Sequence, residues 1–187
     1  MMKVIRKQEL EVQDIQKIQT GDQIVIPLAE FGEFTATAQK ITEKGVLFMF
    51  DDCVTEQQMN KRWTNAGGYA KSHMKKWFDT VLLSSFPEEL QVRIQDLALP
   101  TYGMMFGHDY KYERTFESDD DEQLPLMTKR KNRVADFNDD YEWYWLQNAT
   151  KNDCSAAHFA YVTSFGTSNY HDAPVSNGVR PVFWLVK

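Results

Sequence analysis

The sequence predicts an α+β fold with an N-terminal β-hairpin region, two central helices and an irregular C-terminal sheet of mixed or antiparallel strands. Three observations predict it. Alternating and β-branched segments precede residue 51, apolar residues at helical spacing follow residue 72, and aromatic strand-like segments fill the last third. Hydrophobic residues make up 42% of the 187-residue chain and charged residues 26%, as in an ordinary folded domain. We expect a single domain over 1–187, in which 1–20 form an N-terminal extension.

The hairpin is predicted from β-type patterns on both sides of a turn. Residues 24–26 are Ile-Val-Ile, and the following Pro27 favours an edge position because proline cannot donate to a ladder. Residues 34–41 alternate apolar and polar, which is typical of a half-buried strand. Glu-Lys-Gly at 43–45 predicts a tight turn into the apolar strand 46–50.

Two helices are expected in the centre of the chain. Ser72 has the character of an N-cap, and one apolar face follows it at helical spacing: Met74, Trp77, Phe78, Val81 and Leu82. A second short helix is predicted from Pro87 to Ile94, because Ser85 and Glu88 match a capping box. Leu97, Leu99 and Pro100 indicate an extended exit.

Two polar stretches are predicted to lie outside regular structure. Residues 55–69 are expected to form a loop, with Trp63 inserted into the core or serving as the anchor of a lid. Residues 101–140 contain an acidic run at 117–122 and a basic cluster at 129–133, which predicts an irregular, charged and solvated excursion. A mobile loop over a site is the alternative, and the acidic run lacks the ligand spacing of a calcium loop.

The C-terminal third is expected to consist of strands. They are predicted at 141–146, 159–163 and 179–186, and the polar loops between them contain Asn148 and the segment 166–172. The last strand is apolar to its end, so truncation there should damage the fold.

Charge and cysteine usage exclude several classes of protein. Acidic residues exceed basic residues by 27 to 21, which argues against unspecific binding to nucleic acid phosphates. No segment has the length of a membrane span, and the charged N-terminus lacks an apolar signal core. We therefore expect a cytoplasmic protein, with surface or virion association left open. Cys53 and Cys154 are expected to be reduced thiols in a small core.

The order of several motifs resembles a widespread bacterial and phage family of unknown function. They are a serine-capped helix with Trp77-Phe78-Asp79, then Tyr-Trp-Leu-Gln-Asn at 144–148, then Gly-Val-Arg-Pro at 178–181 before an apolar strand. Members of that family typically show W-L-N, W-W-L-R-S and G-V-R-P at these places. Here the arginine and serine of the second motif are replaced by Gln147 and Asn148, so roles of those two residues do not carry over.

The ending is also similar to that of formylglycine-generating enzymes and C-type-lectin-like folds. This resemblance implies a C-type-lectin-like architecture, but a fold does not fix a function. Those enzymes hold copper with two cysteines near the C-terminus, whereas here only Cys154 lies in that region. The motifs by which such lectins bind calcium do not occur, and no histidine pattern of a metal site is present. We expect no metal and no cofactor.

Seven residues are candidates for ligand binding. Arg180 interrupts an apolar strand, so it either pairs with carbonyl or carboxylate groups or forms a fork for an anion. The other six combine aromatic stacking with hydrogen bonding, as many binding surfaces do: Trp143, Tyr144, Asn148, His158, Tyr170 and His171.

The function expected from these features is that of a non-catalytic binding or structural module for a carbohydrate or a protein surface. The first alternative is an enzyme, either of the formylglycine-generating type or a hydrolase in which Cys154 pairs with His158 or His171. The second alternative is an intracellular assembly protein with an obligate partner. The oligomeric state stays open.

Overall fold

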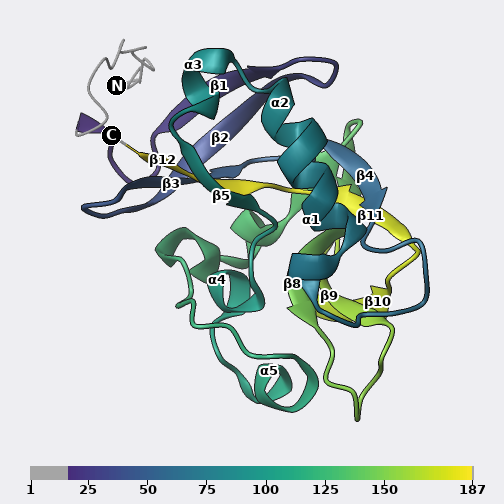
Figure 1. Ribbon diagram of the computed structural model, residues 1–187. Helices are drawn as coiled ribbons and strands as arrows, with labels where there is room; N and C mark the ends of the chain where they lie inside the picture. Colours follow the sequence, from purple (N-terminus) through teal and green to yellow (C-terminus); the bar gives the residue numbers. More distant parts are fainter. Residues whose placement is uncertain (1–16, 187) are drawn as a thin grey trace.

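The computed structural model describes residues 17–186, which form two five-stranded sheets, one short two-stranded sheet and several short helices (Figure 1). The α+β prediction is confirmed. Most of the predicted N-terminal extension, residues 1–16, lies outside the described residues. Within 17–186, no helix is long and apolar enough to cross a membrane.

The first sheet contains the predicted hairpin. Its strands are antiparallel and follow the spatial order β1 (Gln23–Leu28), β2 (Gly32–Ile41), β3 (Gly45–Phe50), β12 (Val182–Val186) and β5 (Ile94–Ala98). The edge position predicted from Pro27 is confirmed within residues 17–186, where β2 is the one strand that pairs with β1. β12 lies between β3 and β5, so the last strand of the chain holds the two halves of this sheet together.

The second sheet is mixed. It follows the order β10 (Ser168–Asp172), β9 (His158–Val162), β8 (Tyr144–Ala149), β11 (Ser176–Val179) and β4 (Thr55–Gln58), and β11 runs parallel to β8. The short sheet pairs β6 (Ala135–Phe137) with β7 (Asp140–Glu142). The sequence predicted loops where β4 and β10 lie, because both strands are polar and lack an apolar alternation.

The two large sheets are joined by the dipeptide Arg180-Pro181. The prediction of one continuous terminal strand is therefore wrong: β11 ends at Val179 in one sheet and β12 begins at Val182 in the other. Proline has no N–H for a ladder, which favours a break at this place. The Pro181 carbonyl accepts a hydrogen bond from the Phe50 amide at 3.0 Å, so the crossover stays attached to β3.

The first predicted helix is present. The Ser72 hydroxyl accepts a hydrogen bond from the Lys75 amide at 3.0 Å and caps α1 (His73–Trp77). A 3₁₀ turn, η2 (Tyr69–Lys71), precedes α1. The helix then continues through the π-helical segment η3 (Phe78–Leu82) into α2 (Leu83–Ser85). Met74, Phe78 and Leu82 point into the core, as the helical spacing predicts, but Val81 of the same predicted face is 39% exposed.

The capping box predicted for the second helix is wrong. The Ser85 hydroxyl donates backward to the Leu82 carbonyl at 2.7 Å, so it serves the end of the preceding helix. The second helix is the single turn α3 (Glu88–Gln91), and no side chain caps it.

Much of segment 101–140 is packed rather than solvated, which differs from the sequence expectation. It contains α4 (Tyr102–Phe106), α5 (Tyr110–Thr115) and the 3₁₀ turns η4 (Pro125–Thr128) and η5 (Arg130–Arg133). The acidic run is held in place by one of its own members. An Asp119 carboxylate oxygen accepts from the Gly103 amide at 3.1 Å and from the Asn148 side-chain amide at 2.8 Å.

The buried side chains form two hydrophobic clusters on opposite faces of the second sheet. One lies between the sheets and the α1–α2 helix and includes Trp145. The other includes Tyr144 and the buried apolar residues of segment 101–140. Because β8 is covered on both faces, Tyr144 and Trp145 are both fully buried.

Trp63 belongs to neither cluster: it is 69% exposed, so the prediction of a core position is wrong. Met59 and Tyr69 from the same stretch fill the core instead.

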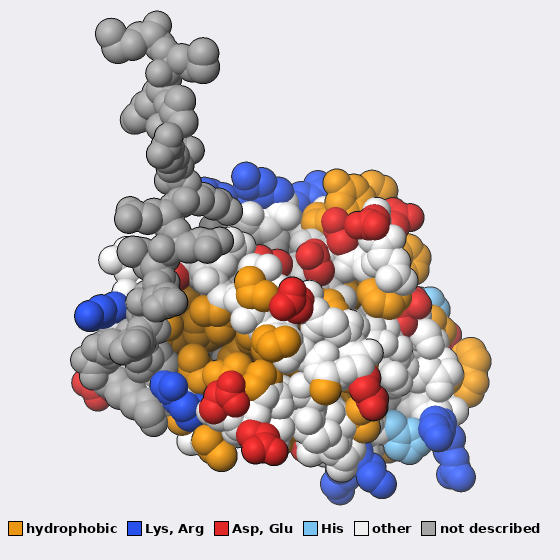
Figure 2. Space-filling model, turned by 90° about the horizontal axis from the view of Figure 1, so that it is seen from above, with side chains coloured by type: hydrophobic (Ala, Val, Ile, Leu, Met, Phe, Trp, Pro, Cys, Tyr) orange, Lys and Arg blue, Asp and Glu red, His pale blue; other side chains and the backbone are white. Residues whose placement is uncertain are grey.

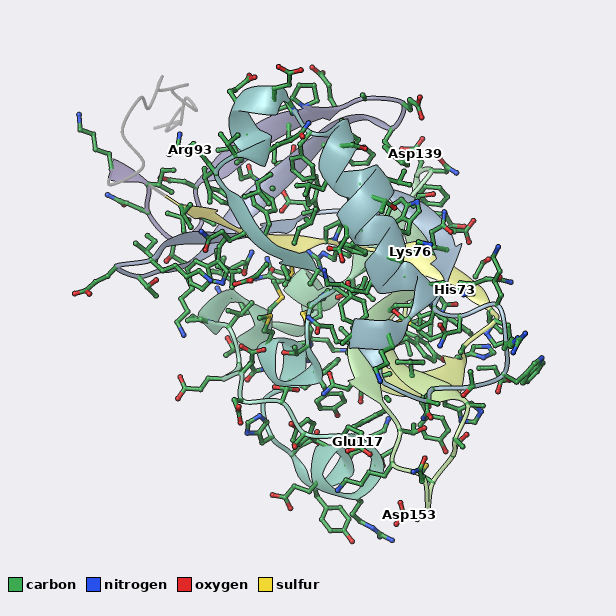
Figure 3. All side chains as sticks on the ribbon, viewed as in Figure 1. His73, Lys76, Arg93, Glu117, Asp139 and Asp153 are labelled. Carbon is green, nitrogen blue, oxygen red and sulfur yellow. The ribbon has the colours of Figure 1, made fainter. Side chains whose placement is uncertain are left out.

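The surface mixes charge with exposed apolar side chains. Seen from above, hydrophobic side chains gather in a shallow hollow and acidic side chains stand at its margin (Figure 2). Arg93 lies at the end of β12, where its Nε donates to the Val186 carbonyl at 3.1 Å, and Glu117 and Asp153 lie near α5 at the opposite end of the molecule (Figure 3).

Replacing Gly178 by alanine is expected to destabilise the fold by about 1–3 kcal/mol, the usual range for overpacking. A Cβ built at this position would lie 2.6 Å from the Cys53 sulfur and 2.8 Å from the Glu142 Cγ atom. Urea unfolding measures the loss, with Ser176→Ala on the exposed start of β11 as the control. Equal stability of the two variants would contradict this packing.

Candidate functional site

The crossover between the two sheets places the Arg180 guanidinium in the interior. Arg180 is 4% exposed. Its Nε donates to the Phe50 carbonyl at 2.8 Å, and its Nη1 donates to the Asn132 carbonyl at 3.2 Å and to the Tyr144 hydroxyl at 3.1 Å. One side chain therefore connects β3, η5 and β8.

The partners of Arg180 are all neutral. Among the described residues, no carboxylate lies within ion-pair distance of its guanidinium, and Nη2 donates no hydrogen bond. Arg180 lines the adjacent cavity, and Nη2 is the guanidinium nitrogen that has no acceptor among the described residues. A buried arginine normally has a carboxylate or several carbonyls as hydrogen-bond partners. Here the Nη2 edge of the guanidinium is unused, because it donates to no described residue.

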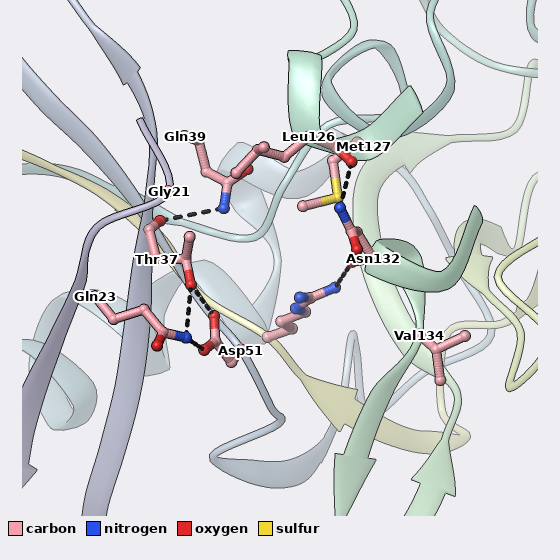
Figure 4. A pocket seen from close by; sticks show the side chains of 10 residues that line it. Gly21, Gln23, Thr37, Gln39, Asp51, Leu126, Met127, Asn132 and Val134 are labelled. Atoms are coloured by element: carbon pink, nitrogen blue, oxygen red, sulfur yellow. Dashed lines mark hydrogen bonds between the residues drawn. The ribbon is translucent and has the colours of Figure 1, made fainter. Parts of the chain in front are cut away.

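The cavity beside this edge has a volume of about 360 Å³. We call it the Arg180 cavity. The hairpin β1–β2 and the residue after β3 form one wall, and η4, η5 and Val134, which precedes β6, form the other (Figure 4). The lining residues are Gly21, Gln23, Thr37, Gln39, Asp51, Leu126, Met127, Asn132, Val134 and Arg180.

The hairpin wall is polar. Asp51 Oδ1 accepts from the Thr37 hydroxyl at 2.5 Å, and Oδ2 accepts from the Gln23 side-chain amide at 2.7 Å (Figure 4). The Gln39 amide nitrogen donates to the Thr37 carbonyl at 3.1 Å, but its oxygen is buried without a hydrogen-bond partner. This oxygen has almost no accessible surface, so it is not open to a ligand in the cavity.

Tyr144 supports Arg180 instead of offering a surface to a ligand. It is fully buried, and its hydroxyl donates to the Arg133 carbonyl at 2.5 Å while it accepts from Arg180. The guanidinium lies 5.3 Å from the centroid of the Tyr144 ring, within the range of a cation–π interaction. The sequence placed Tyr144 among the binding candidates, but the structure makes it a positioning residue.

The pKa of Tyr144 predicts how stability depends on alkaline pH. Burial raises this pKa to about 12, although the Arg180 charge opposes the shift, and burial also raises the pKa of Tyr102 to about 12. An unfolded chain releases phenol protons near pH 10. Between about pH 10 and 12 the native state thus keeps protons that the unfolded state loses. The stability is fully present below pH 10 and falls as the pH rises through this window.

Melting temperatures between pH 8 and 11.5, measured by circular dichroism, test this expectation. The melting temperature should be level to about pH 10 and then fall, less steeply in Tyr144→Phe because one titrating phenol is gone. An unchanged slope in that variant would contradict the assignment.

Trp143 and His171 lie together on one face of the second sheet. The Trp143 indole stacks on Tyr161 with 5.2 Å between ring centroids, and its N–H donates to the Ser164 hydroxyl at 3.3 Å. The His171 ring lies 6.5 Å from the Trp143 ring. Trp143 is 40% exposed, so this group of three rings presents one accessible aromatic plane.

His158 and Tyr170 lie on the other face of the β9–β10 pair. Their rings stack at 5.3 Å, and His158 Nε2 lies 2.7 Å from Asp172 Oδ1. Asn148 is separate from both groups. Its amide oxygen accepts from the Tyr102 amide at 2.6 Å and its nitrogen donates to Glu117 and Asp119, so its side chain is used within the fold. The seven candidates therefore do not form one site. They lie in four places: Trp143 with His171, His158 with Tyr170, Tyr144 with Arg180, and Asn148 by itself.

The cysteines differ from the sequence expectation. Both are free, but only Cys53 is buried, and the prediction of a core position is wrong for the exposed Cys154. Burial raises the pKa of the Cys53 thiol far above neutral pH, which disfavours a reactive thiolate. No hydrogen bond joins Cys154 to His158 or His171 within the described part of the chain. In residues 17–186, no three His, Cys, Asp or Glu side chains are grouped to hold a metal ion.

Three residues of the Arg180 cavity were missed at the level of sequence: Gln39, Asp51 and Asn132. Gln39 occupies a polar position of an alternating strand and Asp51 follows a buried strand, which are ordinary places for solvated side chains. The one available signal was Arg180 itself, whose charge in an apolar segment requires polar neighbours.

Comparison with known proteins identifies a family but no activity. The model of the family described as a domain of unknown function, DUF6273, matches residues 43–187. No curated protein and no solved structure shows a significant match. The match covers both sheets except for β1 and β2, and it includes Arg180 and the walls formed by η4 and η5. The chain therefore belongs to the DUF6273 family.

Proposed function

We propose that this chain is a non-catalytic binding module that takes a small carboxylate-bearing ligand in the Arg180 cavity. The observation that carries the proposal is the unused edge of a buried guanidinium that faces a cavity of about 360 Å³. Guanidinium groups match carboxylates in geometry and charge. Because carbonyls and a phenol already fix this guanidinium, a ligand would meet a donor held in position, which lowers the cost of ordering it.

The proposal can be tested with a matched pair of probes. 4-Methylpentanoate and 4-methylpentanamide have nearly the same shape, but only the first carries a charge. We expect calorimetry and thermal shift to detect the carboxylate and not the amide. A ligand at a hundred times its dissociation constant stabilises the native state by about 2.7 kcal/mol.

Two arginine variants complete the test. Arg180→Lys keeps a positive charge but loses the planar fork, so it should bind the carboxylate at least about tenfold more weakly. Arg93→Lys changes an arginine at the end of the first sheet, away from the cavity, and should bind as the wild type does. Equal binding of acid and amide, or of the two variants, would contradict the proposal.

A second candidate is carbohydrate binding at the accessible plane of Trp143. Its indole is fixed by Tyr161 and Ser164, and fixed aromatic planes suit the apolar faces of sugars. A glycan array probed with wild type and Trp143→Ala separates the two ideas. A sugar signal that Trp143→Ala removes and Arg180→Lys leaves intact would favour this second site.

A further inference from the structure

We infer that the ligand of the Arg180 cavity is a zwitterion in which a protonated amine accompanies the carboxylate, as in an α-amino acid with an apolar side chain. This inference rests on the proposed function and adds the chemical class of the ligand. It follows from two properties of the cavity wall that a carboxylate alone leaves without a role.

The first property is the carboxylate of Asp51. Its hydrogen-bond partners are the neutral Thr37 hydroxyl and Gln23 amide. Among the described residues, no lysine, arginine or histidine lies within ion-pair distance of it, and it forms no ion pair with Arg180 although both line the cavity. The cavity therefore presents one negative and one positive group, each with only neutral protein partners.

The second property is the apolar side of the opposite wall. Leu126, Met127 and Val134 line it, and none of them can hydrogen-bond through its side chain. A cavity of about 360 Å³ has room for a single amino acid. The charged ends of such a ligand would meet Arg180 and Asp51, while its side chain would contact this wall.

Calorimetry can isolate the contribution of the amine. The twenty common L-amino acids are titrated into the wild-type protein, each beside the carboxylic acid that lacks its amino group; leucine is paired with 4-methylpentanoate. We expect at least one amino acid with an apolar side chain to bind at least tenfold more tightly than its deaminated partner. The partner should still bind measurably, because Arg180 recognises it.

Two variants locate the effect. Asp51→Asn removes the charge but keeps an acceptor for Thr37, and it should reduce the preference for the amino acid to less than about threefold. Asp96→Asn deletes a carboxylate that pairs with Lys44 outside the cavity, and it should leave the preference intact.

The failure of the inference and the failure of the proposed function give different results. If the carboxylic acids bind and the amino group adds nothing, the ligand class is wrong and the carboxylate site stands. If neither amino acids nor carboxylic acids bind the wild-type protein, both are wrong.

Discussion

Replacement of Trp145 by alanine is expected to destabilise the protein by about 3–5 kcal/mol, the range for a fully buried tryptophan. The side chain has no exposed surface, and its indole N–H donates to the Gln57 carbonyl at 2.9 Å. It thereby connects β8 to the edge strand β4 from within the cluster that lies between the two sheets. The variant loses this contact and leaves a large cavity in the centre of the molecule.

Trp143→Ala is the matched control, because it removes the same side chain two residues away. Trp143 is partly exposed and stacks on Tyr161, so its loss should amount to no more than about 1.5 kcal/mol. Urea denaturation of both variants gives the comparison. Similar losses at the two positions would contradict the burial described for β8.

Replacement of Arg180 by methionine is expected to destabilise the protein by about 2–5 kcal/mol, because buried acceptors lose their donor. The carbonyls of Phe50 and Asn132 and the hydroxyl of Tyr144 all receive hydrogen bonds from this one guanidinium. Since these groups belong to β3, to η5 and to β8, the loss should loosen the contact between the sheets and the 125–134 segment.

Arg93→Met provides the comparison for this prediction. Its Nε makes one hydrogen bond to the end of β12, so the expected loss is about 0.5–1.5 kcal/mol. Denaturation curves of both variants are measured without ligand. If Arg180→Met were as stable as Arg93→Met, the guanidinium would not hold the crossover in place.

The strands and the first helix could be predicted because their signals are local. Alternation over 34–41, the apolar run 46–50 and the serine cap at Ser72 each specify an element from within a few residues. The predicted α+β class follows from these elements and is confirmed by the two sheets. The C-type-lectin-like architecture stays a prediction, because no solved structure matches the chain.

Other features depend on contacts between distant residues, which periodicity does not report. The strand β10 is polar and exists because it pairs with β9 across a short turn. The charged segment 101–140 packs because apolar residues scattered among its charges, such as Tyr102, Met105 and Phe116, share one cluster. Because charged residues dominate this part of the sequence, its pattern gave no indication of the cluster.

The candidate site was predicted only through Arg180. A charged residue in an apolar strand already implied buried polar partners, and the structure identifies them as carbonyls and a phenol. The opposite wall could not be foreseen, since Gln39 and Asp51 reach the cavity only after the hairpin β1–β2 pairs with β3, and β3 with β12.

The central claim is that the Arg180 guanidinium binds a carboxylate, and nitrogen-15 NMR of the arginine side chains tests it most directly. The Arg180 signals are assigned by their absence in Arg180→Lys, and 4-methylpentanoate is then added to the labelled wild-type protein. We predict a saturable shift of the Arg180 Nη signals, with Arg93 unchanged and no shift on addition of 4-methylpentanamide. An Arg180 signal that stays in place, or that shifts equally with the acid and the amide, would contradict the claim.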